Sequence, residues 1–318
     1  MIHARRLSRT FKTKSGAVDA VAPLDLDVQP GEIVGLLGPN GAGKTTTLRM
    51  LTTVLAPTAG TATVAGADLR SQAREVRRRI GYVAQVGAAP APGSRVAEEL
   101  ITQGRLQGLS RAAATERVTE LLPRLSLGEL GGRALSELSG GQRRRFDVAI
   151  GLVHNPRLVF LDEPTTGLDP QSRANLWEHI RVLRDEFDVT VVITTHYLDE
   201  ADALADRILV MDHGRIVADD TPDALKAQVS GDIISLSIDG DLAEAERAGR
   251  AAIEVRSATT EADVLHLTVE RGDVAVAPLL RALDAANLPL RSVTVARPTL
   301  DTVFLTLTGR SLREDAAV

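Results

Sequence analysis

A glycine-rich segment followed by lysine and threonine constrains the fold more than any other part of the chain. It follows an apolar run that ends at Leu37 and precedes a helical stretch through Leu48 and Leu51. It fits the pattern G-x-x-x-x-G-K-[ST] and consists of Gly38, Pro39, Asn40, Gly41, Ala42, Gly43, Lys44 and Thr45. Glycines let backbone N–H groups curl around a phosphate without side-chain clash, and the helix N-terminus adds its positive dipole. The order strand, loop, helix therefore predicts a nucleotide phosphate site.

A second motif, which is acidic, indicates the same nucleotide chemistry. Lys44 supplies a point charge to the β- and γ-phosphates, and the Thr45 hydroxyl can ligate Mg²⁺. Asp162 ends an apolar strand at Leu158–Leu161, where its carboxylate can reach the same metal. Glu163 follows and can accept a proton from an attacking water. An Asp-Glu pair alone would be a solvated strand end, but the phosphate loop in the same chain favours the catalytic interpretation.

The apolar pattern predicts an α/β fold. The runs Ile33–Leu37, Leu158–Leu161 and Val189–Ile193 are nearly continuous, which suits strands of a parallel sheet covered on both faces. The first thirty residues alternate apolar and polar positions and predict antiparallel strands. An inserted helical lobe is expected at about 87–140, and a hairpin follows at about 208–217.

Composition excludes several classes of function. The 318 residues exceed the roughly 250–300 at which a single core stops growing, so a second, smaller domain is expected. The chain has no cysteine, which excludes disulfides, thiol catalysis and Cys-ligated metals. With 37 Lys+Arg against 42 Asp+Glu it lacks the positive field of a general nucleic-acid binder. No signal peptide or membrane span is recognisable, so a cytosolic chain is expected.

A short motif, Leu138-Ser139-Gly140-Gly141-Gln142, precedes the acidic strand. Serine at a helix N-cap followed by two glycines offers a hydroxyl and N–H groups to an anion. Considered by itself, the motif is interpreted as a common helix cap and turn and not as an anion site.

Together these motifs resemble the nucleotide-binding subunit of an ATP-binding-cassette (ABC) transporter. The resemblance covers about residues 1–225 and is carried by Gly38–Thr45, Leu138–Gln142, Leu158–Glu163 and His196, in that order. It implies a P-loop ABC cassette, a mixed sheet with a helical lobe, that binds ATP and Mg²⁺ and hydrolyses ATP.

The resemblance implies a role for each matching residue. Phe11 stands where the family has an aromatic ring that stacks on adenine, usually tyrosine. Asp169 corresponds to a loop that communicates across a dimer, and His196 to a histidine that holds the γ-phosphate and the water, beside Glu163 as the base. The implied Mg²⁺ contacts are Thr45, Gln85 and Asp162. The implied nucleotide contacts are Phe11, Gly38 through Thr46, Gln85, Ser139, Gly140, Gly141, Gln142 and Asp169.

Two arginine clusters are treated differently. Arg74 and Arg77–Arg79 are interpreted as a solvated helix face, whereas Arg143–Arg145, near the presumed phosphate-facing helix start, are expected to attract ATP. Neither cluster is interleaved with aromatic residues, so neither indicates nucleic-acid binding.

The family's logic requires partners. Ser139 and Gly141 serve the nucleotide of a second copy, so a homodimer would hold two ATP sites, and separate transmembrane permease subunits must carry the substrate. The tail Arg297–Arg310 resembles the daunorubicin/doxorubicin-resistance type of exporter ATPase. One departure from that branch is Gln142, where its members often carry methionine. A peripheral position on the cytoplasmic face of the membrane is implied.

The expected domains are 1–229 for the ATP-binding domain and 232–318 for an accessory, dimerisation domain, joined at Ser230–Gly231. Residues 232–318 show a β-α-β-β-α-β rhythm, the ferredoxin-like arrangement, followed by a helix from Leu300.

The leading function is the ATPase of an exporter for a drug or lipid-like hydrophobic molecule. The alternatives are an importer ATPase with a ligand-sensing C-terminal domain and a soluble cassette ATPase of DNA repair or translation.

Overall fold

The computed structural model describes the chain except residues 15, 86–92, 229–230, 262, 297–298 and 309–318. It divides into two compact units, Met1–Thr221 and Pro222–Val318. The first ends earlier than the boundary expected at 229, because helix α8 (Pro222–Gln228) packs against helix α11 (Leu300–Thr308) of the second unit. The expected linker at Ser230–Gly231 and the beginning of the expected lobe, at 87, fall partly outside the described residues, as do both ends of the tail Arg297–Arg310.

A six-stranded sheet forms the centre of the first unit, and it confirms the parallel sheet expected from the three apolar runs. Its strands, in spatial order, are β10 (Arg215–Asp220), β9 (Arg207–Asp212), β3 (Ile33–Leu37), β8 (Thr190–Thr195), β7 (Leu158–Asp162) and β6 (Ile80–Val83). Neighbouring strands are parallel except for the β9–β10 hairpin. The carboxyl ends of β3, β6, β7 and β8 therefore meet at one edge, where ligands bind in such sheets.

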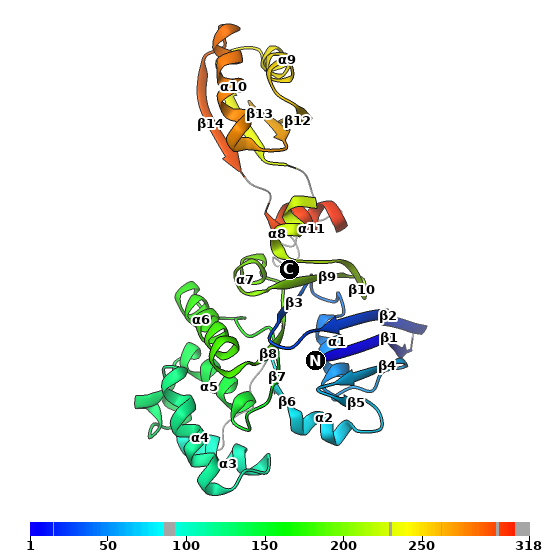
Figure 1. Ribbon diagram of the computed structural model, residues 1–318, viewed down its shortest axis with the longest axis vertical. Coiled ribbons are helices and arrows are strands. Elements are labelled where there is room, and N and C mark those ends of the chain that lie inside the picture. Colours follow the sequence, from blue (N-terminus) through cyan, green and yellow to red (C-terminus); the bar gives the residue numbers. More distant parts are fainter. Residues whose placement is uncertain (15, 86–92, 229–230, 262, 297–298, 309–318) are drawn as a thin grey trace. The chain divides into compact units, whose positions relative to one another are not determined.

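An antiparallel sheet and helix α1 cover one face of these strands, as Figure 1 shows. The antiparallel strands are β2 (Gly16–Val28), β1 (Ile2–Thr13), β4 (Ala59–Val64) and β5 (Ala67–Asp68), which confirms the expectation for the first thirty residues. Helix α1 (Lys44–Leu51) follows the glycine-rich loop, and α2 (Ala73–Arg79) precedes β6. Leu158 and Phe160 of β7 face this side, in a core that includes Leu48 of α1.

Helices cover the other face. Val159 and Leu161 of β7 pack there with Phe146 of α5 and with Leu100 and Leu121 of the lobe. Both faces of β7 are thus buried, which explains its continuous apolar run. The elements on this side are α3 (Val96–Leu106), α4 (Arg111–Arg124), the 3₁₀ turns η1 (Gly128–Leu130) and η2 (Leu135–Glu137), α5 (Gly140–Leu152), α6 (Pro170–Phe187) and α7 (Leu198–Leu204).

The second unit contains the expected β-α-β-β-α-β sequence. Its elements are β11 (Ile233–Ile238), α9 (Leu242–Ala252), β12 (Val255–Glu261), β13 (Val264–Val269), α10 (Gly272–Ala285) and β14 (Leu290–Ala296). The sheet order β12-β13-β11-β14, antiparallel throughout, is that of a ferredoxin-like fold. The second strand begins two residues later than the expected Ile253, because that side chain packs against the core from the turn after α9.

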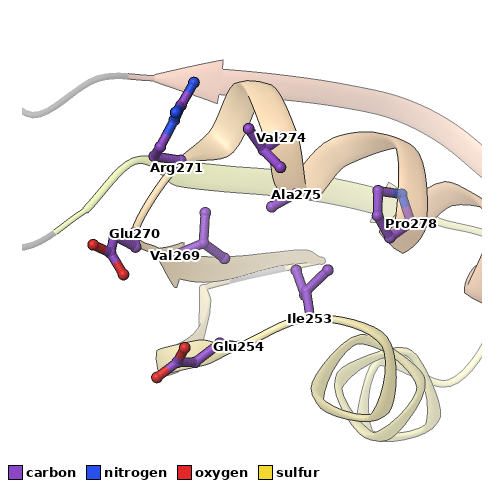
Figure 2. A pocket seen from close by; sticks show the side chains of 8 residues that line it. All are labelled: Ile253, Glu254, Val269, Glu270, Arg271, Val274, Ala275 and Pro278. Atoms are coloured by element: carbon purple, nitrogen blue, oxygen red, sulfur yellow. The ribbon is translucent and has the colours of Figure 1, made fainter.

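A groove of about 320 Å³ lies on this second unit, between the beginning of α10, the end of β13 and the α9–β12 turn (Figure 2). Apolar side chains of Ile253, Val269, Val274 and Pro278 line it, with charged residues at its rim. Within the described ranges of either unit, no helix is both long and apolar enough to cross a membrane.

Candidate functional site

The glycine-rich loop lies between β3 and α1 and encloses Lys44, the first residue of α1. Gly41 and Gly43 adopt positive φ values of 80° and 100°. A Cβ at Gly43 would lie 2.7 Å from the carbonyl oxygen of Ala20, so the loop can follow this path only with glycine there. Lys44 is buried, and its Nζ donates hydrogen bonds to the carbonyls of Gly38 at 2.5 Å and Pro39 at 2.9 Å.

The loop borders a cavity of about 370 Å³, a size suited to a small-molecule ligand. Its lining brings together loop residues, the beginning of α1 and two side chains from the ends of β6 and β7. The lining residues are Ala20, Pro39, Asn40, Gly41, Ala42, Gly43, Lys44, Thr45, Thr46, Arg49, Gln85 and Glu163. Most of the residues expected from the sequence therefore lie in one place.

Asp162 links the beginning of α1, which lines this cavity, to the neighbouring strand β8. Its Oδ1 accepts hydrogen bonds from the hydroxyls of Thr45, at 2.9 Å, and Thr194 of β8, at 2.7 Å. Asp162 is 1% exposed. Thr45 and Asp162 thus place two oxygen atoms side by side, in the chemistry that Mg²⁺ prefers.

Glu163 occupies a strained and heavily connected position. Its φ of 44° is unusual for a residue with a Cβ. Its backbone N–H donates to the hydroxyl of Thr194 at 3.0 Å, and its Oε2 accepts from Gln85 Nε2 at 2.7 Å and from Thr166 Oγ1 at 3.2 Å. On the other oxygen, Oε1, His196 Nδ1 lies 3.4 Å away and Lys44 Nζ 3.9 Å away.

These neighbours set the ionisation of the site. The pKa of the Glu163 carboxyl is lowered chiefly by the His196 imidazole; burial opposes this, and Lys44 and Thr166 lower it further. Burial lowers the pKa of Lys44, while the Glu163 and Asp162 carboxylates oppose this shift. The lowered pKa favours the ionised form of the Glu163 carboxyl, which is the form that can accept a proton.

The serine-glycine motif begins helix α5. Ser139 is its N-cap, and Ser139 and Gln142 form a capping box, in which Gln142 Oε1 accepts from the Ser139 N–H at 2.9 Å. A Cβ on Gly141 would approach Ser172 Oγ to 2.9 Å, and Ser172 N–H donates to Asp169, the N-cap of α6. The motif and Asp169 are therefore neighbours.

Neither the Ser139–Gln142 motif nor Asp169 belongs to the lining of the Lys44 cavity, so one chain does not bring all the expected residues together. Phe11 is also outside that lining. It lies on β1, paired with Val18 of β2, and the Arg9 guanidinium lies 4.6 Å from the centre of its ring. Ala20, two positions after Val18, is the β2 residue that does line the cavity.

The chain is similar in sequence to known proteins of one family. Residues 21–166 match the family model described as "ABC transporter". The "Daunorubicin/doxorubicin resistance ATP-binding protein DrrA" of Streptomyces peucetius is 45% identical over 293 residues, 91% of this chain and 88% of that protein. The "Nod factor export ATP-binding protein I" of Cupriavidus metallidurans is 39% identical and covers 92% of this chain and 93% of its own length. The chain belongs to the ABC transporter ATP-binding subunits.

Solved structures of ABC cassettes agree with the fold. The ATP-binding cassette MJ0796, solved as a dimer in "a post-hydrolysis state" bound to ADP and Pi, superposes with a TM-score of 0.62 at 25% identity. The match covers 70% of this chain and 98% of that cassette. The P-loop ABC fold and the ATP-hydrolysing activity predicted from the sequence are thus confirmed.

The ABC subunit holds donors suited to a magnesium nucleotide. Lys44 Nζ donates to loop carbonyls, and the loop borders a cavity with room for an anion beside it. Among the described residues no three His, Asp or Glu side chains gather closely enough to hold a metal by themselves. The Thr45 hydroxyl and the Asp162 carboxylate, 2.9 Å apart, fit Mg²⁺, which keeps waters and binds through one or two carboxylates together with substrate phosphates.

Two features of this ABC site were missed or misread in the sequence. Thr194 bonds both Asp162 and Glu163, yet a hydroxyl at a strand end gives no signal until the strand order is known. Arg143–Arg145, which are expected to attract ATP, do not line the described cavity of their own chain. Arg144 instead points into the protein, where its guanidinium donates to backbone carbonyls, and Arg145 donates to Asn175 of α6.

Proposed function

We propose that this chain powers the export of a drug or lipid-like hydrophobic molecule through separate transmembrane permease subunits. The observation that carries the proposal is the carboxylate at the Lys44 cavity: Glu163 lines this cavity, its Oε2 accepts hydrogen bonds from Gln85 and Thr166, and Lys44 Nζ lies 3.9 Å from its Oε1. The exporter direction is supported by the relatives, whose names describe drug resistance and Nod factor export.

In this proposal the chain's own residues divide the work of hydrolysis. Lys44 would bind the β- and γ-phosphates, and Thr45, Asp162 and Gln85 would hold Mg²⁺, which would neutralise charge on the phosphates. Glu163 takes the proton of the attacking water, while His196, beside Glu163 Oε1, orients the γ-phosphate and the water.

The proposed engine needs a second copy of the chain. The separation of the Ser139–Gln142 motif from the Lys44 cavity supports a site completed in trans, in which Ser139 and Gly141 of one copy bind the nucleotide held by Lys44 of the other. Asp169, next to Gly141, would lie at that interface. Closing two such sites on ATP and reopening them after hydrolysis converts binding energy into motion of the lobes.

The remaining parts fit a peripheral subunit at the cytoplasmic face of the membrane. Phe11 would stack on adenine from β1, with Arg9 covering the ring from one side. Residues 232–318 are proposed to hold the dimer together. Nothing in the proposal requires nucleic acid.

One observation favours the importer alternative as a second candidate. The groove in Figure 2 has the volume of a small-molecule site and an apolar lining, as a ligand-sensing domain would need. In that case the transported solute should change the ATPase rate, and the effect should disappear when residues 232–318 are removed. A solute that leaves the rate unchanged would count against sensing by this domain.

The direct test is efflux from cells that produce the chain with its membrane subunits. We expect Glu163→Gln to abolish efflux and to lower ATP hydrolysis to a small residual rate while ATP binding persists, because only the proton acceptor is removed. Binding is measured with a fluorescent ATP analogue and efflux with a fluorescent hydrophobic cation. Hydrolysis at the wild-type rate in this variant would exclude Glu163 as the base, and uptake instead of efflux would favour the importer.

A further inference from the structure

Arg144 lies in the second turn of α5 and makes an unusual set of contacts. It is 7% exposed, and its guanidinium carries five N–H groups. Each of the three nitrogens donates to backbone carbonyl oxygens. The acceptors are Pro164 for Nε (2.6 Å), Ala84 and Gln85 for Nη1 (2.8 and 3.3 Å), and Asp162 and Glu163 for Nη2 (3.1 and 3.2 Å). All five donors are therefore used by the protein.

The five carbonyls come from two neighbouring segments. Ala84 and Gln85 directly follow β6, and the other three begin at the last residue of β7, the parallel strand beside it. These segments carry three side chains that the ATP site depends on, those of Gln85, Asp162 and Glu163. The guanidinium thus hydrogen-bonds the backbone of both segments that carry those side chains.

Glu163 shows why such a contact matters. Its left-handed backbone is unfavourable for a residue with a Cβ and persists only where neighbours hold it. Thr194 holds its N–H, and Arg144 holds its C=O. The peptide groups on both sides of the proposed base are therefore fixed, one by β8 and one by α5.

We propose that Arg144 is a positioning residue for ATP hydrolysis, which fixes the backbone of Gln85, Asp162 and Glu163 and ties all three to the helix that begins with Ser139. Arg144 does not line the nucleotide cavity and therefore acts through these residues. The nearest carboxylate, Asp147 on the same helix, is 4.0 Å from Nη1, so the carbonyl dipoles are the chief partners of this charge.

The geometry requires arginine. A lysine ammonium has three donors on one nitrogen and cannot reach two segments at once, whereas the planar guanidinium spans both. Arg144→Lys keeps the charge and removes the fork. Arg145→Lys is the matched control, since Arg145 is the next residue on the same helix and contacts Asn175 of α6.

The test is steady-state hydrolysis by the full chain, together with ATP binding. We expect Arg144→Lys to lower kcat between about 10- and 100-fold, because small displacements of reacting groups have effects of that order. The dissociation constant of a fluorescent ATP analogue should change less than about threefold, because the phosphate loop is untouched. Arg145→Lys should leave both within about twofold of wild type.

A double variant separates positioning from a general loss of stability. If Arg144 acts through Glu163, then adding Arg144→Lys to Glu163→Gln should lower the remaining single-turnover rate by less than about threefold. Circular dichroism melting of each variant shows which of them are folded at the assay temperature. If Arg144→Lys does not fold, Arg144→Gln, which removes the buried charge, takes its place in the same experiments.

Four results would overturn the proposal. They are a kcat for the folded Arg144 variant within about twofold of wild type, a loss of ATP binding in parallel with kcat, full additivity in the double variant, and an equal effect of Arg145→Lys.

Discussion

Lys44 is held in place by carbonyl groups of its own loop. Its ammonium donates to two carbonyls of its own loop and lies 3.9 Å from Glu163 Oε1, so the buried charge is balanced inside the protein. A nucleotide phosphate offers stronger, charged acceptors in the same place. These contacts hold the buried ammonium of Lys44 in a position where it can bind an anion.

We expect Lys44→Ala to weaken ATP binding by about 10- to 100-fold, the equivalent of losing hydrogen bonds to a charged group. Titration with a fluorescent ATP analogue measures the affinity. Lys226→Ala, on α8 in the second unit, is the control and should bind ATP like wild type. An affinity of the Lys44 variant within about threefold of wild type would contradict the assignment.

Glu200 gives a prediction about pH. It is fully buried on α7, and its Oε1 accepts from Trp177 Nε1 at 3.2 Å. Burial raises the pKa of this carboxyl above the ordinary 4.5, with hydrogen bonds from Thr195, Thr165 and Trp177 opposing the shift. The folded chain therefore holds this proton more tightly than the unfolded chain, and the stability it contributes is lost as pH rises from 4.5 through the raised pKa.

Glu200→Gln keeps an oxygen for Trp177 and removes the titration. We expect the free energy of unfolding of the variant, relative to wild type, to increase as pH rises above 4.5. Urea denaturation of both proteins at each pH measures the difference, and other titrating groups cancel because they are common to both. A difference that does not change with pH would mean that Glu200 titrates normally.

At the residue scale the sequence predicted what is local. Lys44, Thr45 and Asp162 sit in short motifs whose spacing is set by one loop or one strand. Thr194 and Arg144 acquire their partners from strands far away in the chain, so no local pattern identifies them. Arginines after the serine-glycine motif were read as anion-binding because their charge is visible in the sequence and the direction of their side chains is not.

At the scale of the elements, hydrogen bonds in the first turn of helix α5 stabilise its N-terminus. The Ser139–Gln142 capping box satisfies N–H groups that a helix N-terminus leaves without partners. It also gives Gln142, a departure from the resembled branch, a structural role in this chain.

Gln142→Met removes the acceptor for the Ser139 N–H while keeping the size of the side chain. We expect the variant to be less stable by about 0.5–1 kcal/mol, the usual range for losing part of a helix cap. Urea denaturation of both proteins measures the difference; an unchanged stability would show that the capping box is not needed.

Strands were predicted better than boundaries. Continuous apolar runs identified β3, β7 and β8 because both faces of each are buried. The first compact unit ends at Thr221, before the expected 229, and the packing of α8 on α11 joins residues far apart in the sequence.

On the scale of the whole molecule, the nucleotide cavity belongs to one of the two units. All residues that line the Lys44 cavity lie in Met1–Thr221. We expect a chain that ends at Thr221 to bind ATP with wild-type affinity but to dimerise more weakly, because the proposed contact through 232–318 is absent. Sedimentation equilibrium of both chains in the presence of ATP measures this; equal dimer dissociation constants would remove the proposed role of the second unit.

The account rests on two copies closing around ATP, and sedimentation velocity of the Glu163→Gln variant tests that most directly. With Mg²⁺ and ATP we expect a stable dimer, with ADP a monomer, and with Ser139→Arg added to the variant a monomer in both. A variant that binds ATP to saturation and still sediments as a monomer would contradict the shared site.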